Sequence, residues 1–224
     1  MVPVNLDRDV PPLSRDLEDF AQSIKGFMPP EEGRALYRAG YTAASQGPLL
    51  EVGTYCGKSA LYFGAAARKN NEKVFTIDHH RGSEENQPGW EHHDPEVVDD
   101  RTGEIDTLPF FRRNIYDAGL EDTVIGIVGD SIDVAERWET SLALVFIDGG
   151  HGEEPAHNDY ENWSPKVRPG GLLLIHDVFE DPEEGGRPPY EIFCRAIDSG
   201  NFEEVSRTGS LRILRKTPEN DTMS

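Results

Sequence analysis

Residues Leu50–Ser59 read L-E-V-G-T-Y-C-G-K-S, and this stretch decides which fold the chain can adopt. Pro48 blocks a helix before it, and the apolar residues around Leu50 favour a buried strand. Gly53 and Gly57 then bracket a tight turn, and the residues that follow, S-A-L-Y-F-G-A-A-A-R-K, favour a helix. A strand, turn and helix in this order present free backbone N–H groups to a ligand. The stretch therefore predicts an α/β domain with a ligand site at the turn.

The glycine spacing argues against two common ligands of such a turn. A phosphate-binding loop needs G-x-x-x-x-G-K-[ST], but only three residues separate Gly53 from Gly57. A dinucleotide-binding turn needs G-x-G-x-x-G, but Thr54 and Tyr55 stand where glycines would be expected. Neither an ATP-binding nor a nicotinamide-binding turn is predicted.

Composition limits the class of protein and of partner. The 224 residues suffice for one domain, and no apolar run approaches the ~18 residues of a membrane span. A net charge of −20 repels nucleic acids and anionic membranes, so we expect neither as a partner. The N-terminus lacks the features of a signal peptide, and the two cysteines, Cys56 and Cys194, suit a reducing compartment. We therefore expect a cytoplasmic protein.

Hydrophobic periodicity predicts the other elements. Two helices, from Ser14 to about Phe27 and from Glu31 to about Ser45, precede the glycine turn; they either cap a substrate site or pack against the sheet or a second subunit. A further helix is expected over Leu108–Leu120. Strands are expected at Lys73–Asp78, Val124–Asp130, Leu142–Asp148 and Leu172–Asp177, with two more within Phe202–Lys216.

Residues 79–107 lack any periodicity, and a segment this long inside a compact domain is usually a lid or disordered. Its four histidines come in adjacent pairs, which is not the spacing of a zinc site. Trp90 and Gln87 are the residues of this loop that we expect to contact substrate. An exposed Trp in a polar loop is otherwise hard to explain, because large apolar side chains are usually buried unless they bind a ligand.

The pattern E-x-G-x-x-x-G resembles motif I of the class I S-adenosylmethionine-dependent methyltransferases. Further motifs follow in that family's order: Asp78 after a strand, 25 residues beyond Gly53, then G-D-S at 129–131 and P-G-G at 169–171. The resemblance implies a Rossmann-like, seven-stranded, mostly parallel sheet with helices on both faces and an antiparallel C-terminal hairpin. It assigns residues 49–217 to the methyltransferase domain and leaves 1–48 as an N-terminal arm with cap helices.

The resemblance also implies the residues that bind S-adenosylmethionine. The glycine turn and the Ser59 hydroxyl would hold its amino-acid end, Asp78 its ribose, and Asp130 with Ser131 its adenine. The full set of cofactor-binding candidates is Glu51, Gly53, Tyr55, Gly57, Ser59, Asp78, Asp130, Ser131 and Asp148.

A reacting site is expected where two buried strands end in acids. Asp148 and Asp177 would meet at the carboxyl edge of the sheet, and neighbouring strands about 4.8 Å apart let two acids share one ion. The pattern D-x-x-H, with His151, resembles the metal-dependent sugar and polyketide O-methyltransferases, in which acids hold Mg²⁺ and the histidine is the base. His176 stands in place of that subgroup's second acid, so both it and Asp177 can be ligands only if the strand has already ended.

The expected activity is therefore Mg²⁺-dependent (or Mn²⁺-dependent) O-methylation of a small molecule. A sugar is favoured because vicinal oxygens can chelate an ion, and a methylated mannose oligosaccharide of the kind mycobacteria make is one candidate acceptor. The alternatives are a metal-independent natural-product methyltransferase, an aminopropyltransferase-like enzyme and a non-catalytic cofactor-binding module. Structural roles also remain open, with the acids as helix N-caps and His151 as a loop histidine bonded to backbone. We expect a homodimer.

Overall fold

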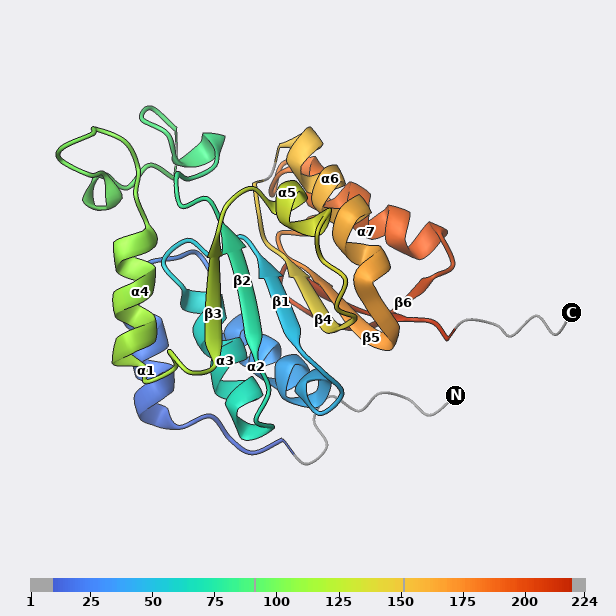
Figure 1. Cartoon of the computed structure of the whole chain (residues 1–224). Helices are drawn as coiled ribbons and strands as arrows, with labels where there is room; N and C mark the ends of the chain where they lie inside the picture. Colours follow the sequence, from blue (N-terminus) through green and yellow to red (C-terminus); the bar gives the residue numbers. More distant parts are fainter. Residues whose placement is uncertain (1–9, 91, 151, 219–224) are drawn as a thin grey trace, which may run out of the picture.

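The computed structural model describes residues 10–90, 92–150 and 152–218, and its centre is a single seven-stranded sheet (Figure 1). The strand order is β3-β2-β1-β4-β5-β7-β6. The first five strands in this order are parallel, and β7 runs antiparallel to both of its neighbours. The sequence-based fold, including the C-terminal hairpin, is confirmed. The strands are β1 (Leu49–Val52), β2 (Val74–Asp78), β3 (Val124–Val128), β4 (Leu142–Ile147), β5 (Val167–Ile175), β6 (Phe202–Thr208) and β7 (Leu211–Lys216).

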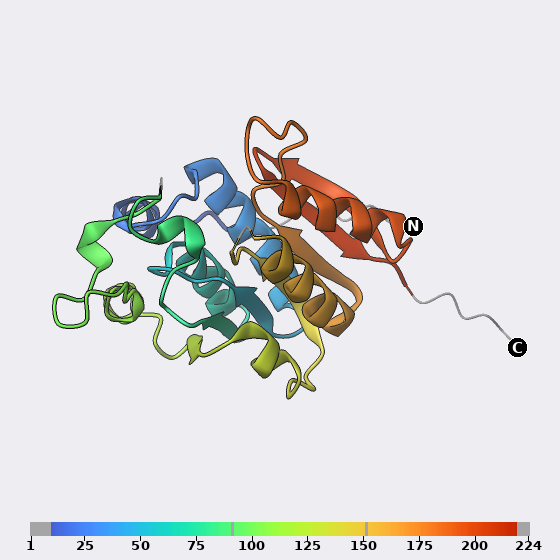
Figure 2. The ribbon, with the colours of Figure 1, turned by 90° about the horizontal axis from the view of Figure 1, so that it is seen from above.

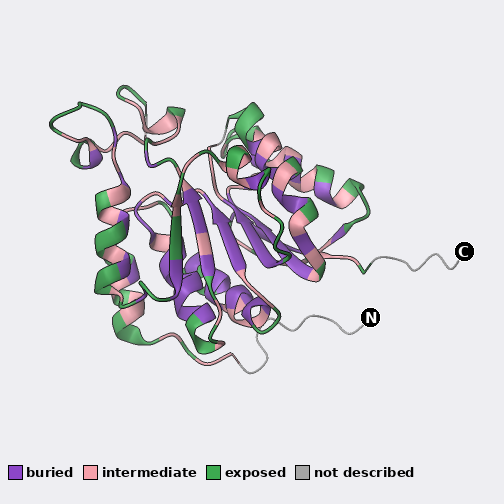
Figure 3. Ribbon diagram, in the orientation of Figure 1, coloured by how far each residue is buried: buried purple, intermediate pink, exposed green. Residues whose placement is uncertain are grey.

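Helices cover both faces of this sheet, as expected. One core joins the first four helices to one face, and its aromatic centre is the edge-on contact of Phe63 with Phe146, 5.5 Å between ring centres. The other core joins the last three helices to the opposite face around fully buried Trp163. The central strands are buried, whereas much of the edge strand β3 and the outer sides of the helices are exposed (Figure 3). The helices are α1 (Arg15–Ser23), α2 (Pro30–Ala44), α3 (Lys58–Lys69), α4 (Leu108–Asp117), α5 (Ser131–Ala135), α6 (Glu153–Trp163) and α7 (Arg187–Asp198).

The N-terminal helices belong to the main core. Ser14 caps α1 as expected, accepting a hydrogen bond from the Leu17 amide. The helix ends at Ser23 rather than near Phe27, because Ile24 is extended and Gly26 has a φ of +143°. Helix α2 packs along α3 and onto the sheet face, so its apolar residues complete the covering layer. The early end of α1 frees residues 24–29 as a connection that reaches the carboxyl edge of the sheet.

The segment 79–107 has little regular structure, as its sequence predicts. Only two short 3₁₀ turns, Glu84–Asn86 and Pro95–Val97, and one antiparallel bridge between Val98 and Ile105 occur in its described part. From above the sheet it lies beside the N-terminal helices (Figure 2). Within the described residues, no helix combines the length and the apolar character that crossing a membrane requires.

Candidate functional site

A cavity of about 1050 Å³ lies at the carboxyl ends of the parallel strands. Its walls come from the glycine turn, from the residues after β2, β3, β4 and β5, and from the loop 79–107. Most predicted site residues reach it: Gly53, Tyr55, Ser59, Asp78, Trp90, Asp130, Ser131, Asp148, His176 and Asp177. Glu51, Gly57 and Gln87 do not line it.

The glycine turn already binds a carboxylate, that of Asp78. Both N–H groups at the tip of the turn donate to Asp78 Oδ2, from Thr54 at 2.9 Å and from Tyr55 at 2.8 Å. Tyr55 has a left-handed φ of +49°, which is rare for a residue with a side chain and is a form of strain typical of functional sites. The turn's donors therefore fix Asp78 at the cavity wall, and its role toward a ribose stays a prediction.

Gly53 and Glu51 are held by the sheet itself. Gly53 has a φ of +86°, and a Cβ there would overlap the Asp148 carbonyl oxygen, so only glycine lets β1 and β4 end side by side. Glu51 is fully buried behind the turn and accepts a hydrogen bond from the Thr54 hydroxyl at 3.2 Å. Burial raises the pKa of Glu51 to about 8, against the opposing effect of nearby hydroxyls. Glu51 thus supports the turn from beneath.

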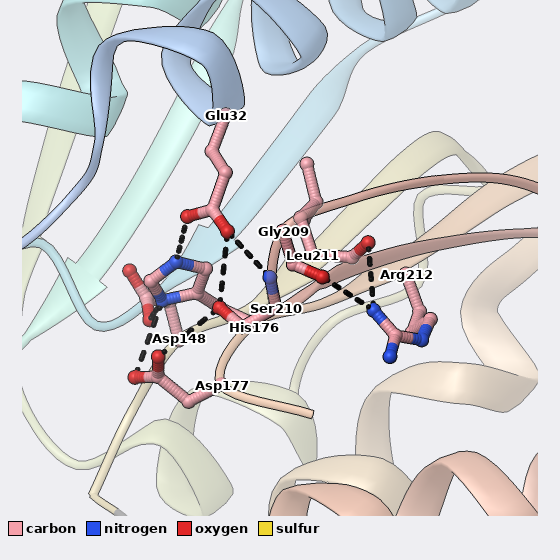
Figure 4. A network of polar contacts seen from close by, with 8 residues as sticks. All are labelled: Glu32, Asp148, His176, Asp177, Gly209, Ser210, Leu211 and Arg212. Carbon is pink, nitrogen blue, oxygen red and sulfur yellow. Dashed lines mark hydrogen bonds and ion pairs between the residues drawn. The ribbon is translucent and has the colours of Figure 1, made fainter. Parts of the chain in front are cut away.

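Asp148, His176 and Asp177 line the cavity and form one cluster (Figure 4). His176 Nδ1 lies 2.9 Å from Asp148 Oδ1 and 3.3 Å from Asp177 Oδ2. Strand β5 ends at Ile175 and Asp177 has a φ of +54°, so the chain turns and both side chains face the same point. The ligand atoms of the three residues lie within 4.8 Å of one another, which is compatible with one shared ion. The condition that the strand must end before His176 is met.

Glu32 completes this cluster, although no local sequence pattern points to it. His176 Nε2 lies 2.7 Å from Glu32 Oε2, while Glu32 Oε1 accepts from the Ser210 amide at 2.6 Å. A Cβ at Gly209 would overlap Glu32. One carboxylate thereby ties helix α2 and the β6–β7 hairpin to the centre of the site (Figure 4).

The cluster holds His176 in its charged form. Burial lowers the pKa of His176, but the charge of Asp148 and the hydrogen bonds of Asp148, Asp177 and Glu32 outweigh it and raise that pKa well above its ordinary value. Burial likewise raises the pKa of Glu32, but the hydrogen bond and charge of His176 bring it below its ordinary value. The three carboxylates around His176 thus favour its charged form.

Asp130 and Ser131, the residues expected to contact the adenine, also make hydrogen bonds within the protein. Asp130 caps α5, its Oδ1 accepting from the amides of Ile132 at 2.9 Å and Asp133 at 3.2 Å. The Ser131 hydroxyl accepts from the Trp163 indole N–H at 2.8 Å. Both line the cavity, and their contact with a base stays a prediction.

A bridge of side chains joins residues 24–29 to the loop 79–107 over the cavity. Lys25 Nζ lies 2.6 Å from Asp94 Oδ2 and 2.5 Å from Glu96 Oε2. The rings of Phe27 and His92 lie 4.8 Å apart between centres. We call these residues, Lys25, Phe27, His92, Asp94 and Glu96, the latch.

Two loop residues were expected to contact substrate. Trp90 is 53% exposed and lines the cavity, which leaves its side chain available to a ligand. The Gln87 amide donates to the carbonyl oxygens of Arg81 and Ser83, so it holds the loop together. Substrate contact stays a prediction for both. His151, the expected base, lies outside the described residues.

Comparison with known proteins decides the family. A family model described as a methyltransferase domain matches residues 50–178, more than half of the chain. The chain belongs to the methyltransferase-domain family. The match spans β1 to the residues after β5, and with it the glycine turn, Asp78 and the central cluster. The prediction that the protein is a methyltransferase is confirmed.

Solved structures show the same fold for this methyltransferase. An O-methyltransferase from Bacillus cereus in complex with SAH is 16% identical, with 92% of each chain covered and a TM-score of 0.63. The SAH-bound methyltransferase PaMTH1 from Podospora anserina is 14% identical over 95% of this chain and 92% of its own, with a TM-score of 0.63. TomG from Streptomyces achromogenes, an O-methyltransferase of tomaymycin synthesis in complex with SAM, is 16% identical over 92% and 91%, with a TM-score of 0.61.

Proposed function

We propose that this methyltransferase moves the methyl group of S-adenosylmethionine to a hydroxyl of a small molecule, with Mg²⁺ or Mn²⁺ in its site. The observation that carries the proposal is the placement of Asp148, His176 and Asp177 in the same cavity as the glycine turn. Structures of the same fold described as O-methyltransferases with SAH or SAM bound support the reaction class and the cofactor.

The residues of the cavity suit an adenosine-containing cofactor. Asp78 lies at the end of β2, the place where α/β folds position a carboxylate for ribose hydroxyls. Ser59 lines the cavity in the first turn of α3, close to the positive end of the helix dipole and hence suited to a carboxylate. Asp130 and Ser131 follow β3 and can face the base.

The central cluster suits a divalent ion in its donor atoms. Two carboxylates and an imidazole nitrogen converge there, and oxygen-rich sets favour Mg²⁺ or Mn²⁺ over zinc. Glu32 holds the far nitrogen of His176, the arrangement that orients metal-binding histidines in many proteins. When bound, such an ion lowers the pKa of a hydroxyl that it contacts. Binding through His176 would require its Nδ1 proton to leave.

The protein's own residues have two tasks in this chemistry. Methyl transfer forms a carbon–oxygen bond, breaks a carbon–sulfur bond and leaves the hydroxyl proton to be taken up. Asp148 and Asp177 can orient the acceptor hydroxyl, and His151, three residues after Asp148, is proposed to take the proton. Residues 24–29 and the loop 79–107 both line the cavity and are joined by the Lys25–Asp94 ion pair, and we propose that they limit the access of water.

A metal-independent methyltransferase is the second candidate, and one observation favours it. Both ring nitrogens of His176 have carboxylate partners, so its positive charge already occupies the space between Asp148 and Asp177. In that case His176 would neutralise the acids and hold them in place, and His151 would act alone as base.

For the acceptor we propose a sugar hydroxyl, with a methylated mannose oligosaccharide as one candidate. The lining contains nine carboxylates and only two lysines among the described residues: Asp78, Glu85, Asp130, Asp148, Glu154, Asp159, Asp177, Glu183 and Glu184, with Lys25 and Lys58. Such a wall disfavours phosphorylated or carboxylated acceptors. The acidic lining also suits a polyamine, so aminopropyl transfer stays an alternative reaction. The mass added to the product distinguishes methyl transfer from aminopropyl transfer.

The test combines binding and turnover. S-adenosylhomocysteine should raise the melting temperature and ATP and NAD should not, because the turn fits only the first. Turnover on sugar-containing cell extract with labelled methyl donor should stop with EDTA and return with Mg²⁺ or Mn²⁺. Asp148→Asn and Asp177→Asn should match the EDTA result, while Glu161→Gln, an exposed change on α6, should not. EDTA-resistant turnover would select the metal-independent candidate, and absence of cofactor binding would overturn both.

A further inference from the structure

A buried serine at the tip of the C-terminal hairpin contacts two carboxylates of the central cluster. Ser210 comes directly before β7, and its hydroxyl oxygen lies 3.1 Å from Glu32 Oε1 and 3.3 Å from Asp177 Oδ1. The pairing of β5 with β7 explains the second contact. Ile175 pairs with Arg212, and the same register continued along both strands places Ser210 opposite Asp177. The hairpin therefore contributes a side chain to the cluster where β5 ends (Figure 4).

The backbone around Ser210 leaves its hydroxyl proton available to Asp177. A hydroxyl has one proton to donate. The Ser210 amide already donates to Glu32 Oε1 at 2.6 Å, so that oxygen has a donor without the hydroxyl. The Ser210 carbonyl oxygen accepts from the Val178 amide at 3.0 Å, which holds the residue that follows Asp177 against the hairpin. The hydroxyl can therefore donate to Asp177 Oδ1.

The hairpin tip is itself held in place on both sides of Ser210. Gly209 has a φ of +54°, and a Cβ there would overlap Glu32 Oε1, so the close approach of the two segments requires glycine. The guanidinium of Arg212, a buried residue, donates to the Gly209 carbonyl oxygen at 2.9 Å. A tip fixed in this way presents the Ser210 hydroxyl at a defined position.

Asp177 is the cluster residue whose orientation such a hydroxyl would affect. Its backbone has a left-handed φ of +54°, a form of strain typical of functional sites. Its side chain is 25% exposed, against 5% for His176, so it faces the cavity more openly. Asp177 Oδ2 lies 3.3 Å from His176 Nδ1, and a hydrogen bond at the other oxygen fixes the plane of the carboxylate.

We propose that Ser210 is a positioning residue whose hydroxyl holds the Asp177 carboxylate in the orientation that binds the divalent ion. The inference rests on the proposed function, because it assigns a residue to the site of that ion. Removing a hydrogen-bond partner of a ligating group typically weakens metal binding about 10–100-fold. A serine that only closed the hairpin turn would instead affect the stability of the whole protein.

The test measures ion binding without turnover in four proteins. Mn²⁺ is titrated into each protein with saturating S-adenosylhomocysteine, and free Mn²⁺ is followed by electron paramagnetic resonance. The proteins are the parent, Ser210→Ala, Ser210→Thr and the control Ser206→Ala, a half-buried serine in β6 of the same hairpin. Calorimetry gives the affinity of each protein for S-adenosylhomocysteine, and urea unfolding gives its stability.

Ser210→Ala should bind Mn²⁺ about 10-fold or more weakly than the parent, with its affinity for S-adenosylhomocysteine within about threefold. Ser210→Thr, which keeps the hydroxyl, and Ser206→Ala should bind Mn²⁺ within about threefold of the parent. Parent-like Mn²⁺ binding by Ser210→Ala, an equal loss of both ligands, or a Ser210→Thr as weak as Ser210→Ala would each overturn the inference and leave the proposed function intact. A parent that binds S-adenosylhomocysteine but not Mn²⁺ would overturn both the proposed ion and this inference.

Discussion

His176 Nε2 lies 2.7 Å from Oε2 of Glu32, although the two residues are 144 positions apart in the chain. The contact joins the first turn of an N-terminal helix to the end of the fifth strand. The same carboxylate binds the tip of the C-terminal hairpin through Ser210. Three distant segments therefore meet at one buried ion pair in the centre of the site (Figure 4).

Replacing Glu32 should reduce stability in a defined pH window. Glu32→Ala leaves a buried imidazolium with one carboxylate fewer, and loss of one partner of a buried pair costs about 3 kcal/mol. The contribution of His176 is complete below its ordinary pKa and is lost as pH rises through its raised pKa, while that of Glu32 is lost as pH falls through its lowered pKa. Urea unfolding should thus show the largest deficit near pH 6.

The neighbouring Glu31 gives the matched control, because it is exposed on the same helical turn. Glu31→Ala should unfold like the parent across the pH range. A Glu32→Ala deficit that does not change with pH would mean that packing, not the ion pair, accounts for the loss.

Breaking the latch should change cofactor exchange more than stability. Lys25 and its acidic partners are partly exposed, and such pairs contribute at most about 1 kcal/mol. They nevertheless join the two segments that cover the cavity, so Lys25→Met should speed release of S-adenosylhomocysteine in stopped-flow measurements. Asp94→Asn should do the same, and the double variant should add little. Arg34→Met, which breaks the Arg34–Glu18 pair away from the cavity, is the control; equal release rates in all variants would contradict a gating role.

Glu51 should make the protein less stable as pH rises. Its pKa is raised from 4.5 to about 8 by burial, so between these values the folded protein holds a proton that the unfolded chain releases. Stability then falls with pH by up to about 1.4 kcal/mol per unit from this group. Glu51→Gln should show a flatter stability profile from pH 5 to 8, measured by urea unfolding. His176 titrates in both proteins, so the difference between them isolates Glu51, and identical slopes would refute the assignment.

His151→Ala should lower kcat by roughly 10²–10⁴, the usual worth of a general base, with little change in affinity for S-adenosylhomocysteine. The loss should become smaller at higher pH, because the acceptor hydroxyl then ionises more readily without help. Kinetics from pH 6 to 9 would show this. A rate within about threefold of the parent at pH 7 would remove His151 from the proton transfer, and a parallel loss of cofactor binding would make it a positioning residue.

The sequence alone determined the sheet and the residues at its carboxyl edge. Continuous apolar runs such as Leu142–Ile147 are buried on both faces, and parallel strands bring their final residues to one edge, so Asp78, Asp148 and Asp177 could be placed without coordinates. The sequence also predicted the glycine turn, because a positive φ such as that of Gly53 favours glycine whatever residues surround it.

Only the tertiary structure decided which side chains complete that edge. Glu32 reaches His176, and Asp159 reaches the cavity wall, from helices whose angle and register depend on packing across the whole core, and no local pattern encodes such long-range contacts. Asp78 shows the same limit of sequence-based prediction. Its position followed from its strand, but its hydrogen bonds with the Thr54 and Tyr55 amides depend on how the glycine turn folds back toward β2. Local periodicity places a residue on an element, whereas its partners are set by the packing of elements far apart in the chain.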